Sequence, residues 1–169
     1  MHPVNPGIQD RGVPAFLDAR LVVHEGDERC AIELKHWTRK GKITVGDELF
    51  HLRENGAYDI AAHDFWEGVR RVERLVEHGH ADCGFALALS NAPRVWAPAG
   101  PVPTNDDAFR LTDGRHVEGT LAWGPATGAG TKKGCEEPIA LRGAYDVKWQ
   151  EYSNEGGHTF RYVVLEIQK

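Results

Sequence analysis

Three features that would have assigned this chain of 169 residues to a class are missing from it. No apolar run approaches the roughly 18 residues that a membrane-spanning helix needs. The first residues, MHPVNPGIQDRG, hold no apolar stretch, so we expect no secretory signal. Acids outnumber Lys and Arg by 25 to 20, for a net charge of −5. This balance excludes nucleic-acid binding through bulk positive charge and leaves room only for a local basic groove.

Cysteine is also scarce, and its spacing indicates neither a zinc site nor a set of disulfides. Cys30, Cys83 and Cys135 are odd in number, far apart and without a CxxC pair. We therefore expect no disulfide framework, and a reducing cytoplasm as the location of the protein.

The remaining composition is that of one ordinary globular domain spanning 1–169. Apolar residues make up 41% of the chain and charged residues 27%. Residues 1–13 are predicted to be coil, 38–42 a basic loop, 91–106 a further loop, and 43–56 are ambiguous. Period-two patterns and turn residues predict the following strands: 15–23, 29–37, 83–90, 107–112, 115–123, 138–150 and 158–168.

The clearest element is a helix over 58–78, whose apolar residues recur at spacings of three and four. These are Ala62, Phe65, Val69, Val72 and Val76. Such a stripe packs on a sheet. Strand 83–90 is apolar throughout, so we expect both of its faces to be covered. The order of elements predicts an α+β fold, in which one helix crosses over between strands of a mixed sheet and β-hairpins extend the C-terminal part.

The sharpest motif is Glu33-Leu34-Lys35 on the second predicted strand, with Asp18 on the first. Residues two apart in a strand point the same way, so Glu33 and Lys35 share a face. A register that brings Asp18 to this face would gather two carboxylates and an ammonium. Two carboxylates can hold a divalent ion through oxygen ligands, and such an ion can activate water for attack on a phosphate. The lysine would orient that water or neutralise the developing charge.

The length of the turn between the two strands decides whether this site exists. A four-residue turn at 24–27 places Asp18 opposite Glu33, as a metal site needs. A two-residue turn at Gly26-Asp27 places Arg20 there instead, and its guanidinium would fill the space of the ion.

The segments LDARLVV and CAIELKHW, the basic loop, the helix YDIAAHDFWEGVRRVERL and the strand FALALSN together resemble the PD-(D/E)xK nuclease superfamily. The likeness implies a restriction-endonuclease-like core over 15–92 and leaves 93–169 as a β-rich extension of unassigned role. It also implies that Asp18 and Glu33 are metal ligands, with the backbone carbonyl of Ile32 as a third. Lys35 would be the catalytic lysine and Mg²⁺ or Mn²⁺ the ion.

The resemblance implies a metal-dependent nuclease that hydrolyses phosphodiester bonds, with DNA as the expected substrate, in restriction, repair or antiviral defence against phage. The alternative is an inactive nuclease-like fold that binds nucleic acid or protein. The acidic net charge favours a homodimer or a partner protein, and no membrane partner is expected.

Other charged and aromatic residues have weaker claims to a role in the site. Arg39, Lys40 and Lys42 form a basic stretch without an acid, which suits phosphate contacts or simply a solubilising loop. Pairing with helix glutamates four residues away accounts for three helix arginines: Arg70, Arg71 and Arg74. Three further helix residues would face the site if the helix runs past it: Tyr58, His63 and Glu67.

Overall fold

The computed structural model describes residues 9–10, 13–14, 19–23 and 28–169, with side chains from Arg29 onward. Its strands are β1 (Gln9–Asp10), β2 (Val13–Pro14), β3 (Ala19–Val23), β4 (Glu28–Trp37), β5 (Gly41–Val45), β6 (Glu48–Leu52), β7 (Cys83–Ser90), β8 (His116–Leu121), β9 (Ile139–Asp146), β10 (Gln150–Glu155) and β11 (His158–Ile167). Its helices are α1 (Tyr58–Glu77) and α2 (Ala129–Lys132), with 3-10 turns η1 (Pro93–Val95) and η2 (Asp107–Phe109). None of these helices is long and apolar enough to cross a membrane.

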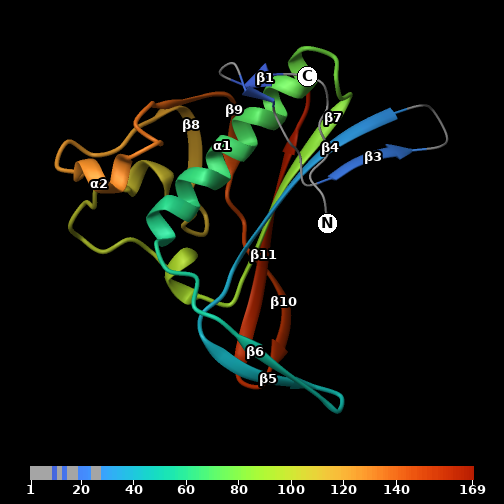
Figure 1. Cartoon of the computed structure of the whole chain (residues 1–169), viewed down its shortest axis with the longest axis vertical. Coiled ribbons are helices and arrows are strands. Elements are labelled where there is room, and N and C mark those ends of the chain that lie inside the picture. Colours follow the sequence, from blue (N-terminus) through green and yellow to red (C-terminus); the bar gives the residue numbers. More distant parts are fainter. Residues whose placement is uncertain (1–8, 11–12, 15–18, 24–27) are drawn as a thin grey trace.

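A five-stranded mixed sheet forms the centre of the molecule, in the order β10-β11-β7-β4-β3. Strands β4 and β7 are parallel neighbours, and the other three pairs are antiparallel. Helix α1 makes the crossover between β4 and β7 and packs against both strands (Figure 1). The prediction of an α+β fold with a crossover helix and a mixed sheet is confirmed.

Small residues on β7 allow α1 to lie close to the sheet. The helix-facing positions of β7 include Gly84, Ala86 and Ala88, and a Cβ at Gly84 would collide with the Val72 side chain of α1. The predicted apolar stripe of the helix is buried, with Val69 and Val72 fully inaccessible to solvent. The core of the protein therefore lies between this face of the sheet and a layer made by α1 and the segment that holds β8 and β9.

The other face of the sheet is uncovered in the described part of the chain. Residues of β7 alternate between buried and half-buried, and the half-buried Leu87 pairs with Leu34 and Val164, which are 41% and 38% exposed. The prediction that 83–90 is covered on both faces is wrong. An apolar run shows that a strand is interior to a sheet, but not that a second layer lies on it.

Several predicted boundaries are also wrong. Segment 107–112, predicted as a strand, begins instead with the 3-10 turn η2, which places the Phe109 side chain in the core, fully buried. Segment 138–150 divides into β9, which pairs with β8, and the start of β10, which pairs with β11. Residues 9–10 and 13–14 pair as β1 and β2 where coil was expected.

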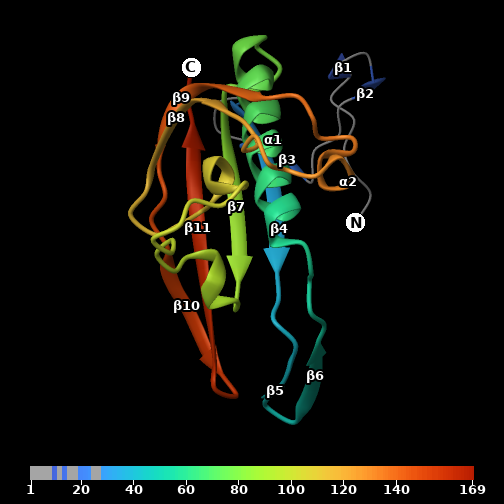
Figure 2. The ribbon, with the colours of Figure 1, turned by 90° about the vertical axis from the view of Figure 1, so that its left-hand side faces the viewer.

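The ambiguous region after the basic loop is a second hairpin, β5–β6. A two-residue turn at Gly46-Asp47 connects its strands, with Gly46 at φ 60°, a conformation that favours glycine. Figure 2 shows that this hairpin extends beyond the ends of β4 and β7.

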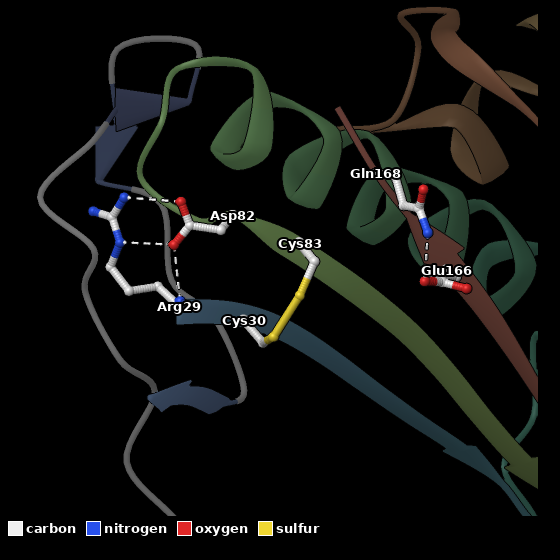
Figure 3. Close-up of a disulfide and its surroundings, with 6 residues drawn as sticks. All are labelled: Arg29, Cys30, Asp82, Cys83, Glu166 and Gln168. Carbon is white, nitrogen blue, oxygen red and sulfur yellow. Dashed lines mark hydrogen bonds and ion pairs between the residues drawn. A yellow bond between two sulfur atoms is a disulfide. The ribbon is translucent and has the colours of Figure 1, made fainter. Parts of the chain in front are cut away.

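A disulfide joins Cys30 and Cys83 (Figure 3). The two residues face each other in the parallel ladder of β4 and β7, although 53 positions separate them in sequence. The expectation that the cysteines form no disulfide is therefore wrong for this pair, and Cys135 is free and buried. Beside the bridge, the Arg29 side chain pairs with Asp82 at 3.2 Å and holds the pKa of that carboxyl below its usual value.

Candidate functional site

The register of β3 and β4 decides between the two turn lengths. Val23 pairs with Glu28, so residues 24–27 separate the strands, and Arg20 pairs with Ala31. The two-residue turn that would place Arg20 opposite Glu33 is therefore wrong. The described ladder ends at Ala19. Asp18 lies outside the described residues, so its role as a metal ligand stays a prediction.

Glu33 and Lys35 lie together on the helix side of β4. The Lys35 Nζ atom is 3.1 Å from Glu33 Oε1, and Glu33 is only 2% exposed. Glu33 is buried because α1 covers it directly. Ile32 belongs to the opposite face of the strand and pairs with Phe85 of β7. The role of its carbonyl as a third ligand stays a prediction.

A third charged residue of the site, Arg71, comes from α1. Its Nη1 atom donates a hydrogen bond to Glu33 Oε1 over 2.7 Å. The helix can approach this closely because Gly68 lies over the glutamate: a Cβ at position 68 would be 2.7 Å from Glu33 Cγ. The sequence interpretation assigned Arg71 to pairing within the helix, which the structure shows for Arg70 and Glu67 at 2.7 Å but not for Arg71.

Gly68 was the signal in the sequence that could have revealed this contact. Glycine in a helix interior costs about 1 kcal/mol relative to alanine, so its presence there indicates close packing. Gly68 lies three residues before Arg71, on the same side of α1. A helix side with a glycine and an arginine is suited to cover a buried carboxylate.

Glu33 has one oxygen that fits a metal. Its Oε2 atom is buried and, within the described residues, has no hydrogen-bond partner. Mg²⁺ is typically held by one or two carboxylates together with waters and substrate phosphates. Among the residues that the structure describes, no group of three or more His, Cys, Asp and Glu side chains could hold a metal. Glu33 thus fits as one ligand, and a second carboxylate would have to come from Asp18.

The basic stretch lies at the base of the β5–β6 hairpin rather than beside Glu33. Arg39, Lys40 and Lys42 are exposed. The backbone N–H of Arg39 donates to Asn91 Oδ1 over 2.7 Å, which fixes the path of the chain as it leaves β4. Arg39 lies six positions after Glu33, which corresponds to up to about 20 Å of extended chain. A long polymer could contact both places, and the phosphate-binding role of these three residues stays a prediction.

Two of the three further helix candidates have their contacts elsewhere. The Tyr58 ring lies under the Arg94 guanidinium, 4.5 Å from it, near the start of α1. His63 is buried between aromatic rings, 5.0 Å from Phe109 and 5.6 Å from Trp123. Both side chains therefore belong to the packing of α1 against the loops that surround it.

Glu73 is a second buried carboxylate that the sequence interpretation missed. Its Oε1 atom accepts hydrogen bonds from the backbone N–H groups of Arg142 and Gly143 and from the Tyr145 hydroxyl, at 3.0, 2.8 and 2.7 Å. Burial, and then the Glu73 carboxylate, raise the pKa of Tyr145 far above its usual value. These contacts join α1 to β9 and leave Glu33 as the buried acid whose partners are cations.

Comparison with protein-family models, curated proteins and solved structures finds no match to this chain. The candidate site is therefore defined by its own geometry: a buried glutamate on a central strand, two cations on one of its oxygens, and a helix that covers it.

Proposed function

We propose that this protein is a metal-dependent nuclease that hydrolyses phosphodiester bonds, with DNA as its substrate, in a restriction, repair or phage-defence setting. The observation that carries the proposal is the Glu33 carboxylate: one of its oxygens is buried and has no partner among the described residues, while Lys35 lies 3.1 Å from the other oxygen. A restriction-endonuclease-like core is part of the same proposal. The hairpin of β3 and β4, the crossover helix and the parallel strand β7 support it.

In this proposal Glu33 Oε2 and the Asp18 carboxylate would hold Mg²⁺ or Mn²⁺. The ion would supply a bound water acidic enough to act as a nucleophile at neutral pH. Lys35 would orient that water or neutralise the charge that develops on the phosphate. Arg39, Lys40 and Lys42 contact the backbone of the polymer away from the cleaved bond.

One observation favours a second candidate function, an inactive nuclease-like module that binds nucleic acid or a protein. Arg71 donates to Glu33 Oε1 at 2.7 Å, so the carboxylate already has a counter-ion without any metal. The two candidates share the fold and differ in whether Glu33 takes part in chemistry.

The test is to incubate plasmid, single-stranded DNA and RNA with the protein in Mg²⁺ or Mn²⁺, beside Glu33→Gln and Asp18→Asn. The first substitution keeps the size of the side chain under Gly68. We expect cleavage by the wild type that both substitutions and excess EDTA abolish. Glu77→Gln is the matched control, because it makes the same chemical change at a carboxylate of α1 that is 42% exposed and pairs with Arg142 away from the site. A folded wild type that cuts none of the three substrates would support the inactive module, whereas a Glu33→Gln variant that cuts as well as the wild type would remove Glu33 from the mechanism.

A further inference from the structure

The two cations of the site converge on a single atom. Lys35 Nζ and Arg71 Nη1 lie 3.1 and 2.7 Å from Glu33 Oε1. Among the described residues, one carboxylate faces two cations, so Glu33, Lys35 and Arg71 together carry one positive charge in excess. A phosphodiester carries one negative charge, so the excess charge of the cluster matches a single linkage of a nucleic acid.

The geometry leaves most of the hydrogen-bonding capacity of both cations unused. A guanidinium has five N–H donors and an ammonium three, and within the described residues Glu33 is the partner of both. The Arg71 side chain is 25% exposed and the Lys35 side chain 29%, whereas Glu33 is 2% exposed. The buried carboxylate thus anchors two cations whose side chains remain partly open to solvent.

We propose that Arg71 is a phosphate-binding residue, which Glu33 and Gly68 hold in place so that its free N–H groups contact the non-bridging oxygens of one phosphodiester. The planar guanidinium suits this task, because two parallel N–H groups match two phosphate oxygens. The inference rests on the proposed function in taking a nucleic acid as ligand, but it needs neither the metal nor hydrolysis.

The test measures DNA binding in excess EDTA, where no cleavage occurs, by the fluorescence anisotropy of a short fluorescein-labelled duplex. Arg71→Gln is expected to weaken binding about tenfold, as the loss of a charge-assisted hydrogen bond implies. It should also reduce the slope of log affinity against log salt by about one. Arg142→Gln is the matched control: Arg142 is 57% exposed and pairs with Glu77, so the same loss of charge there should leave the affinity unchanged.

Two further variants keep the proposal testable if Arg71→Gln does not fold. Arg71→Lys retains a counter-ion for Glu33 but lacks the planar fork, so it should bind several-fold more weakly than the wild type. Glu33→Gln removes the negative charge from the cluster, so it should bind the duplex more tightly in EDTA. Wild-type affinity in a folded Arg71→Gln or Arg71→Lys protein would overturn the assignment, and so would weaker binding by Glu33→Gln.

These outcomes separate this inference from the proposed function. DNA binding that depends on Arg71, together with no cleavage of any substrate in the presence of Mg²⁺ or Mn²⁺, would support the phosphate site and contradict the nuclease function. Metal-dependent cleavage that needs Glu33, with binding indifferent to Arg71, would do the reverse.

Discussion

Glu33 and Glu73 are two buried glutamates that serve different purposes in this protein. Both are under 5% exposed, at 2% and 4%, and α1 contributes to the surroundings of each. Glu73 accepts its hydrogen bonds from uncharged groups, two backbone amides and a phenol. All three groups belong to β9, so Glu73 fixes this strand against α1. Glu33 is held by side chains that carry charge and reach solvent. The chemistry of its partners, rather than burial, makes Glu33 the candidate for function.

Replacement of Glu73 by alanine should destabilise the protein strongly. The change leaves two N–H groups and the Tyr145 hydroxyl buried without an acceptor, at a cost of about 1–3 kcal/mol for each such group. We expect a loss of about 3 kcal/mol in the free energy of unfolding, measured by urea titration.

Glu77→Ala is the control for that experiment. Glu77 belongs to the same helix, and its ion pair with Arg142 is exposed, so its loss should cost less than about 1 kcal/mol. Equal effects of the two substitutions would show that the hydrogen bonds of Glu73 contribute nothing beyond those of a surface carboxylate.

Among the elements, β4 is the one on which fold and site both depend. It pairs with β3 on one edge and with β7 on the other, and it presents Glu33 and Lys35 to α1. Its beginning is joined to β7 through Cys30 and Cys83, three residues before Glu33. A constraint at this position restricts the motion of the strand that carries the site.

The disulfide can be tested by counting thiols after unfolding. Without reductant we expect the chain to take up one alkyl group, on Cys135, and with reductant three, one for each cysteine. A bridge over a sequence separation of 53 stabilises by about 4 kcal/mol in the chain-entropy model. Reduction should therefore lower the midpoint of urea unfolding, and Cys135→Ser should not alter that response. Three alkylated thiols in the unreduced protein would show that Cys30 and Cys83 are not joined by a disulfide.

At the scale of the whole molecule, the five-stranded sheet is covered on one side only in the described part of the chain. Helix α1 and the β8–β9 ribbon lie over one face (Figure 1). Large apolar side chains of the other face, Leu34 and Val164, are 41% and 38% exposed. In a sheet covered on one side, adjacent residues of a strand contribute very differently to the free energy of unfolding, because successive side chains alternate between the covered and the uncovered face.

Adjacent valines of β11 measure this difference directly. Val163 is fully buried and Val164 is 38% exposed, so the same substitution probes both faces. Val163→Ala should reduce the free energy of unfolding by about 2 kcal/mol, since it removes buried methyl groups and leaves a cavity. Val164→Ala should cost less than about 1 kcal/mol. Similar losses, measured by urea titration, would mean that a second layer covers the sheet in solution.

The elements that could be predicted from the sequence are those with a local pattern. The apolar period of 58–78 identified α1 within one residue of its end at Glu77, and the β run of 83–90 identified β7. The motif Glu33-Leu34-Lys35 was sufficient to place two charges on one face. These features depend on residues close together in the chain.

The features that were missed depend on residues far apart in the chain. Arg71 is 38 positions from Glu33, and Tyr145 is 72 positions from Glu73. The hydrophobic period and the turn residues describe one segment of the chain and not the segments that pack against it. They indicate which side of a helix is buried, but not which residues of other elements contact that side. The division of 138–150 has the same cause, because its two halves pair with strands on either side of it in sequence.

The position of β11 has a consequence for synthesis on the ribosome. This strand lies between β10 and β7 in the sheet, yet it follows both of them, and the other described strands, in the chain. A growing chain that already holds β4, α1 and β7 still has an open edge along β7, where unpaired N–H and C=O groups can pair with another chain. The nascent protein must keep that edge apart from its neighbours until β11 emerges and pairs with it.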